Sequence, residues 1–150
     1  IKIDDIPVHS RIIREYLKDG NIKIANKLLG KEYKIYGHQI KGQGLGTKSF
    51  VPTINLKIEE FLLPQEGVYV TKTILDDKEF NSITFLGHRA TTDGSYAVET
   101  HIINEDIKNS NYTTQIKFYE KLRDNKKFDS FEELKKQILN DIETTRIYFK

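Results

Sequence analysis

From residue 33 onward, the chain is a series of short runs of β-forming residues separated by turn signals. The clearest run, Gly67 to Leu75, is rich in Val, Thr and Ile and ends at the Asp76-Asp77 pair, a sequence typical of turns. About six such runs follow one another, which is typical of antiparallel barrels. We therefore expect a mainly β domain whose strands form a closed or nearly closed barrel. The expected strands cover residues 34–40, 51–56, 67–75, 80–86, 96–103 and 113–119.

Helices are expected on both sides of this β region. Residues 1–8 are expected to be extended or irregular, with a break at Pro7, and Ser10 is a plausible N-cap for a short helix. Asn21 can cap a second helix that ends at Gly30. The expected apolar faces of the two helices are Ile13, Tyr16 and Leu17, and Ile24, Ala25, Leu28 and Leu29.

The C-terminal end also has a helical pattern. Ser130 and Glu133 have the spacing of a capping box, in which each side chain bonds the backbone of the other. Apolar residues then recur at helical spacing. We expect this helix to pack on the barrel through Phe131, Leu134, Ile138 and Ile142.

Composition excludes several classes of function. The net charge is +2, with both signs interspersed and no basic stripe, so nucleic-acid binding has little support. There is neither an apolar run of about eighteen residues, as a membrane span needs, nor a signal-peptide pattern. The absence of cysteine excludes disulfides and thiolate metal sites, and it fits a reducing compartment such as the cytoplasm. Because the chain begins with Ile1 and contains no methionine, we expect it to be part of a longer product.

A glycine-rich segment precedes the second expected strand. Gly42, Gly44 and Gly46 alternate with other residues and lead to Lys48. Glycines let backbone amides approach a ligand closely, and lysine offers a cation to phosphate. The spacing differs from that of a P-loop, which needs Gly-Lys-Ser/Thr in direct succession, and from a Rossmann turn.

Thr53 and Asn55 follow this segment on the expected strand. Residues two apart on a strand share a face, so a hydroxyl and a carboxamide lie side by side. Such neutral oxygen ligands suit Mg²⁺ that already carries phosphates and waters. The alternative is a glycine-rich hairpin with ordinary polar residues on an edge strand.

Residues 96–103 alternate between two faces. Val98, Thr100 and Ile102 share one face, whereas Ala97, Glu99, His101 and Ile103 share the other. A carboxylate in a β run is costly to bury unless it is paired or used, so Glu99 could serve as a general base. The alternative is a solvent-facing Glu and His on a half-exposed sheet.

A basic segment connects the last expected strand to the C-terminal helix. Arg123, Lys126 and Phe128 together could hold an aromatic, phosphorylated ligand, with the ring against Phe128 and the charge against Arg123. The alternative is a solvated basic loop.

These clusters, in this order, resemble the riboflavin kinase family over residues 31–150. The resemblance implies a Greek-key barrel of about six antiparallel strands. Residues 8–30 resemble the end of the FMN adenylyltransferase module of bacterial bifunctional riboflavin kinase/FAD synthetases. Residues 1–30 are thus expected to be a helical tail from a covalently linked N-terminal module, and residues 31–150 the kinase domain. Since the adenylyltransferase core is absent, this chain is not expected to make FAD by itself.

The resemblance implies ATP- and Mg²⁺-dependent phosphorylation of the ribityl 5′-hydroxyl of riboflavin, which gives FMN. Glu99 would be the catalytic base, and Thr53 and Asn55 would position the metal. The implied ATP-binding residues are Gly42, Gly44, Gly46, Lys48, Thr53, Asn55, Ile102, Asn104 and Tyr112, and the implied flavin-binding residues are Arg123, Lys126 and Phe128.

The sequence departs from the bacterial pattern at Thr47, where Arg is usual, and at Phe50, where Gly is usual. The resemblance implies that Lys48 replaces the charge of that Arg, as a lysine does in some eukaryotic members. Two other readings remain open: a flavin-binding regulatory module without kinase activity, and an OB-like oligonucleotide binder, which would need a basic groove with stacking aromatics.

Overall fold

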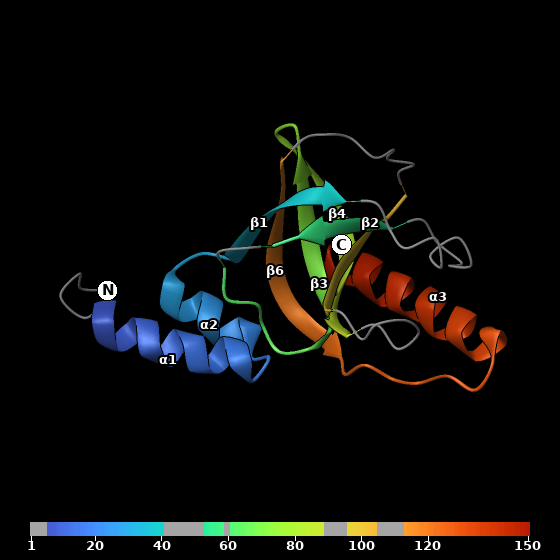
Figure 1. The fold of residues 1–150 in the computed structure, drawn as a ribbon, viewed down its shortest axis with the longest axis horizontal. Helices are drawn as coiled ribbons and strands as arrows, with labels where there is room; N and C mark the ends of the chain where they lie inside the picture. The colour runs from blue at the N-terminus through green and yellow to red at the C-terminus, as the bar shows by residue number, and fades with distance from the viewer. Residues whose placement is uncertain (1–5, 41–52, 59–60, 89–95, 105–112) are drawn as a thin grey trace.

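Six antiparallel strands close into a barrel in the order β1-β2-β5-β4-β3-β6 (Figure 1). The structure is a computed structural model that describes residues 6–40, 53–58, 61–88, 96–104 and 113–150, with side chains from residue 11 onward. The strands are β1 (Tyr33–Ile40), β2 (Ile54–Lys57), β3 (Gly67–Leu75), β4 (Lys78–His88), β5 (Tyr96–Ile102) and β6 (Thr113–Arg123).

The connections confirm the expected Greek key. β3, β4 and β5 pair in succession, and β6 returns beside β3 before it closes the barrel against β1. The β3–β4 turn contains Asp76 and Asp77, whose φ angles are 49° and 66°. Left-handed backbone at both central residues matches the twist of a two-residue hairpin, and Asp tolerates it better than most residues.

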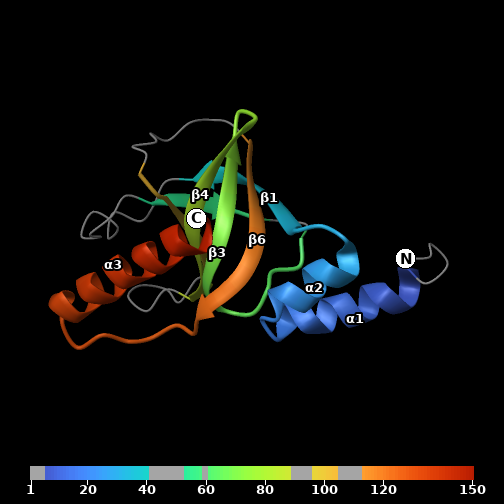
Figure 2. The ribbon, with the colours of Figure 1, turned by 180° about the vertical axis from the view of Figure 1, so that it is seen from behind.

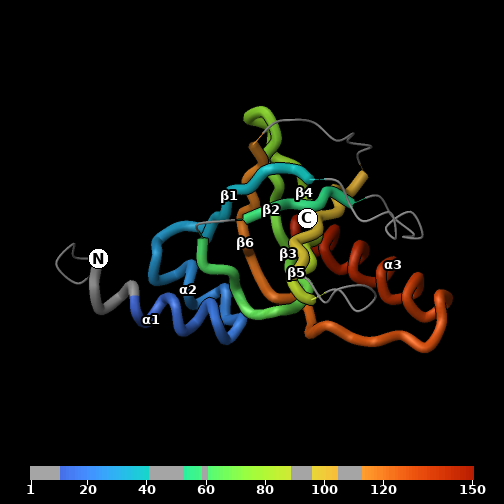
Figure 3. Tube along the Cα trace, viewed as in Figure 1, coloured from blue at the N-terminus to red at the C-terminus, as the bar shows by residue number. Residues whose placement is uncertain are grey.

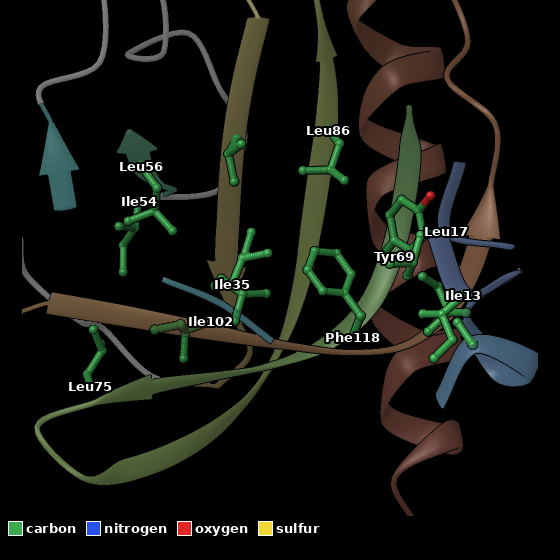
Figure 4. Close-up of a cluster of buried hydrophobic side chains, with 14 residues drawn as sticks. Ile13, Leu17, Ile35, Ile54, Leu56, Tyr69, Leu75, Leu86, Ile102 and Phe118 are labelled. Carbon is green, nitrogen blue, oxygen red and sulfur yellow. The ribbon is translucent and has the colours of Figure 1, made fainter. Parts of the chain in front are cut away.

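Apolar side chains from all six strands fill the barrel (Figure 4). Tyr69 and Phe118 are its largest fully buried side chains, and their rings meet edge to face at a centroid distance of 5.3 Å. This arrangement is favourable because the positive edge of one ring faces the negative face of the other. The other buried members on the strands are Ile35, Ile54, Leu56, Leu75, Leu86, Val98, Ile102 and Ile116.

A chain of buried hydroxyl groups runs across β3, β4 and β5. Thr71 lies 2.7 Å from Ser82 and 2.8 Å from Thr84, measured between hydroxyl oxygens. Thr73 donates to Ser82, and Thr84 lies 2.9 Å from Thr100. All five residues are fully buried, so each hydroxyl finds in a neighbour the partner that water cannot provide.

Helices α1 (Ile6–Lys18) and α2 (Ile22–Leu29) pack together against one side of the barrel (Figures 1 and 2). The expectation for the start of α1 was wrong: the helix begins at Ile6, so Ser10 lies inside it and is not its N-cap. Pro7 falls in the first turn, where its missing N–H costs nothing. Ile13 and Leu17 are buried and extend the barrel core.

Both predicted caps of α2 are confirmed. The Asn21 side chain accepts from the backbone N–H of Ile24, and Gly30 ends the helix with a φ of 79°. The buried residues of this helix are Ile22 and Ala25, whereas Ile24 is exposed, contrary to expectation. Ile22 stands one residue after the cap and turns inward.

Helix α3 (Phe131–Tyr148) lies on the opposite side of the barrel from α1 and α2 (Figure 2). The Ser130 hydroxyl accepts from the backbone N–H of Glu133 at 3.2 Å, which confirms the N-cap. Ile138 and Ile142 pack with Ile83 of β4 in a second apolar cluster outside the barrel. Phe131 was predicted to join this face but is 50% exposed, because it precedes the part of the helix that reaches the barrel. No helix in the described ranges is long and apolar enough to cross a membrane.

Candidate functional site

Strands β2 and β5 are antiparallel neighbours in the barrel (Figure 3). Asn55 of β2 and Glu99 of β5 are direct partners across this pair. Side chains of direct partners leave the same face of the sheet, with Cβ atoms about 4.5–5.5 Å apart. Both residues are half-buried. Thr53 stands two residues before Asn55, immediately before β2 begins, and is half-buried. The barrel thus brings one predicted metal ligand, Asn55, beside the predicted base.

The face that carries these residues is the outer face of the barrel. Val98, Thr100 and Ile102 are buried and point inward, whereas Glu99 and His101 are half-buried, as the alternation of residues 96–103 predicted. On the other side of β5, Glu99 pairs with Phe85 of β4, which packs against the cluster beneath α3. Glu99 therefore stands between Asn55 and an apolar patch, a position that suits a carboxylate facing a partly apolar substrate.

Two of the predicted nucleotide residues, Ile102 and Asn104, lie at and just beyond the end of β5 and differ in burial. Ile102 lies in the barrel core at 4% exposure, so its side chain faces away from the outer surface. Asn104 is exposed just past the strand and adopts a left-handed φ of 64°. Its side-chain oxygen accepts from Arg146 of α3 at 2.8 Å. Helix α3 thus holds one of the residues predicted to lie near the nucleotide.

The three predicted flavin residues come together where β6 ends and the segment to α3 begins. The Arg123 guanidinium carbon lies 6.0 Å from the centroid of the Phe128 ring, and Lys126 Nζ lies 5.9 Å from it. Two cations near one aromatic ring give a compact aromatic and basic cluster. The three residues that were predicted to act together are therefore close to one another in the structure.

Arg123 is also bound to α3. Its Nε donates to both carboxylate oxygens of Asp141 at 3.1 Å, and its Nη2 donates to Oδ2 at 2.8 Å. Asp141 is buried, with a side-chain exposure of 5%. Gln137 donates to the same carboxylate at 2.9 Å. A buried carboxylate held by a planar fork of donors is among the stronger polar contacts in proteins.

A hollow of about 580 Å³ lies between this segment and α3. Lys126, Lys127 and Lys136 line it together with Phe128, and Glu133 is the one acidic residue among the described residues of its lining. The remaining lining residues are Gln137, Leu139 and Asn140. An apolar ring among three cations suits a flat ligand that carries negative charge.

Several predicted residues lie outside the described ranges: Gly42, Gly44, Gly46, Lys48 and Tyr112. Over the residues that the structure does describe, no group of three His, Asp or Glu side chains could hold a metal. A metal at Thr53 and Asn55 would therefore rely on neutral oxygens together with ligands supplied by a substrate.

Sequence reasoning did not identify Gln137, Asp141 or Arg146 of α3, all of which contact predicted site residues. A signal was present for two of them. Gln137 and Asp141 are spaced by four residues beside the apolar positions Ile138 and Ile142, so they lie next to the face that meets the barrel. A carboxylate at the edge of a buried face needs a partner.

Comparison with known proteins gives the same family description for a family model and for full-length relatives. The family model described as Flavokinase: Riboflavin kinase matches residues 29–149. The bifunctional riboflavin kinase/FMN adenylyltransferase of Haemophilus influenzae is 34% identical over 149 residues, covering 98% of this chain and 48% of that protein. The protein of the same description from Escherichia coli K12 is 30% identical and covers 96% of this chain and 47% of its own length. The chain thus spans about half the length of the curated relatives it matches.

Two solved structures share the fold. One is described as a macrolide-efflux protein from Streptococcus pneumoniae; it superposes with a TM-score of 0.84 at 31% identity, over 91% of this chain and 46% of that one. The other is riboflavin kinase from Trypanosoma brucei, with a TM-score of 0.54 at 17% identity, over 77% of this chain and 78% of that one. At that identity the second likeness concerns the fold alone.

Proposed function

The chain belongs to the riboflavin kinase family, and on that premise we propose that it transfers the γ-phosphoryl group of ATP to the ribityl 5′-hydroxyl of riboflavin. The products are FMN and ADP. The observation that carries this proposal is the direct pairing of Asn55 with Glu99, which puts a base beside neutral oxygen ligands on one face of the barrel. Phosphoryl transfer depends mainly on positioning and charge stabilisation, so such an arrangement can do most of the chemistry.

Glu99 is the proposed general base. The 5′-hydroxyl oxygen forms a bond to the γ-phosphorus as the bond from that phosphorus to the bridging oxygen of ADP breaks, and the hydroxyl proton passes to the Glu99 carboxylate. A half-buried carboxylate is accessible to a ligand yet partly shielded from water. Its neighbour Phe85 on β4 provides apolar surface for the substrate side.

The chemistry of Thr53 and Asn55 fits Mg²⁺, because a hydroxyl and a carboxamide oxygen on one face are hard, neutral donors. When bound, the metal would reduce the negative charge of the phosphates. Lys48 and the backbone at Gly42, Gly44 and Gly46 are proposed to bind the phosphates, with Ile102, Asn104 and Tyr112 near the nucleotide. Among these, Asn104 is held by Arg146.

The flavin is proposed to lie beside Phe128, with Lys126 and Arg123 at its edge. The cluster of these three residues and the adjoining hollow support this assignment. A tricyclic ring stacks well on an aromatic side chain, and Lys and Arg side chains are donors for the carbonyl oxygens at the edge of a flavin.

The parent protein is proposed to carry an N-terminal FMN adenylyltransferase half, since the relatives in Haemophilus influenzae and Escherichia coli are bifunctional by description. In this proposal residues 1–30 form the helical tail that joins the two halves, residues 31–150 form the kinase domain, and the protein works in the cytoplasm. The kinase half would then supply FMN to its covalently linked partner.

The test is to incubate the chain with riboflavin, ATP and Mg²⁺ and to separate the flavins by chromatography with fluorescence detection. FMN formation that requires both ATP and Mg²⁺ supports the proposal. Tight riboflavin binding without FMN formation would instead favour a flavin-binding regulatory module. The absence of both binding and turnover, in this chain and in the full-length parent, would overturn the proposal.

A further inference from the structure

We propose that Asp141 is a positioning residue: through Arg123 it holds the segment 124–130 in the shape that receives the flavin. This inference rests on the proposed function for the identity of the ligand. The Asp141–Arg123 pair, which we call the clamp, is argued only from contacts between described residues. We call this segment the flavin loop.

The Arg123 guanidinium makes three separate contacts. One edge binds the Asp141 carboxylate through Nε and Nη2. Nη1 donates to the backbone carbonyl of Asp124 at 3.1 Å, at the start of the flavin loop. The guanidinium also lies over the ring of Phe128, near the end of the loop. One side chain therefore connects α3 to both ends of the flavin loop.

Asp141 is built to hold this guanidinium in one orientation. Its side chain is 5% exposed, and Gln137 donates to Oδ1 from one helical turn earlier. A buried carboxylate without a partner is strongly destabilising. The bidentate bond from Arg123 to Asp141 is therefore costly to break. Gln137 also accepts from Lys126 of the flavin loop at 3.4 Å, which adds a second tie between helix and loop.

The positive charge of Arg123 is compensated by Asp141, whereas Lys126 and Lys127 are exposed on the loop. Arg123 thus acts on the ligand chiefly by arranging Phe128 and the loop backbone. Loss of Asp141 should release Arg123 and let the loop sample other conformations. The expected consequence is weaker flavin binding with little change in the handling of ATP.

The experiment compares wild type with Asp141→Asn, which keeps the size of the side chain but removes its charge. We expect the KM for riboflavin to rise about tenfold, as small misplacements of a binding group can cause. The KM for ATP and kcat should stay within about threefold. Glu143→Gln is the matched control, because Glu143 lies on the same helix and forms an exposed pair with Arg146.

A second readout does not depend on activity. Limited trypsin digestion, followed by mass spectrometry, measures cleavage after Lys126 and Lys127 in the flavin loop, with cleavage after Lys18 at the end of α1 as internal reference. Asp141→Asn should accelerate loop cleavage about tenfold while the Lys18 site changes little. If this holds but neither the wild-type chain nor the full-length parent binds riboflavin or forms FMN, the proposed function fails and the Asp141–Arg123 clamp stands.

If Asp141→Asn does not fold, Arg123→Lys is the alternative test variant. It keeps the positive charge but loses the planar guanidinium that binds both oxygens of Asp141. It should give the same pattern, and the double variant should be no worse than the more affected single variant. Unchanged loop cleavage together with an unchanged KM for riboflavin would overturn the proposal. An equal loss in all kinetic constants, with all tryptic sites cleaved faster, would also overturn it, since that marks a purely structural role.

Discussion

Asn55 and Glu99 face each other across the β2–β5 pair on the outer wall of the barrel. They come from strands that are separated in the chain by β3 and β4. Their meeting depends on the Greek-key connection, which returns β5 to the side of β2. Two short motifs of unremarkable composition therefore form one polar site.

Glu99→Gln should lower turnover by roughly two to four orders of magnitude, the usual contribution of a general base, while riboflavin and ATP binding are kept. Chromatographic measurement of FMN formation gives the turnover, and fluorescence titration of riboflavin gives its binding affinity. Glu79→Gln is the control, since Glu79 is an exposed β4 residue paired with Lys117. Near-wild-type turnover in Glu99→Gln would remove Glu99 from the mechanism.

Thr53→Val keeps the shape of the side chain but removes a proposed metal ligand. We expect the Mg²⁺ concentration for half-maximal activity to rise about tenfold or more, the scale seen when groups around a metal site are removed. Activity should be titrated with Mg²⁺ at fixed ATP. Thr113→Val, at the exposed start of β6, is the matched control. A Mg²⁺ dependence identical to that of wild type would exclude the assignment of Thr53.

Thr84→Val tests the buried hydroxyl chain. Thr84 contacts both Thr71 and Thr100, so its loss deprives two fully buried hydroxyls of a partner. The free energy of unfolding should fall by about 1–3 kcal/mol, as measured by urea denaturation. Thr144→Val, on the exposed face of α3, should change it by less than about 0.5 kcal/mol. A similar change in the free energy of unfolding of both variants would show that the buried hydroxyl groups add no stability.

The Glu79–Lys117 pair should make a small, pH-dependent contribution. The hydrogen bond from Lys117, at 2.8 Å, lowers the pKa of the Glu79 carboxyl, and the same bond raises the pKa of Lys117. A lowered carboxyl pKa stabilises the fold above the unfolded-state pKa of Glu79, and this stability is lost as the pH falls through the folded-state pKa. Because Glu79 is 42% exposed, we expect only about 0.2–1 kcal/mol.

The measurement for this pair is the unfolding free energy of wild type and Glu79→Gln between pH 7 and pH 3. The two proteins should differ at neutral pH and converge in acid. A difference that persists unchanged to pH 3 would contradict the ionic origin of the contact.

Much of the fold could be predicted because its signals are local. Alternation over residues 96–103 showed which side chains point inward, and Asn21, Gly30 and Ser130 marked helix ends by their capping chemistry. The errors have local causes as well. Pro7 suits the first turn of a helix as well as a break, and the apolar pattern of α3 does not show that Phe131 precedes the contact with the barrel.

The order and type of the elements follow from local signals, because periodicity, caps and turns depend on near neighbours in the chain. The meeting of Asn55 with Glu99 and the bond between Arg123 and Asp141 follow from the folded arrangement alone. Strand register and helix docking are set by the packing of the whole barrel, and no local pattern encodes which distant residue becomes a neighbour. The hydroxyl chain from Thr73 to Thr100 likewise exists only once three strands have paired.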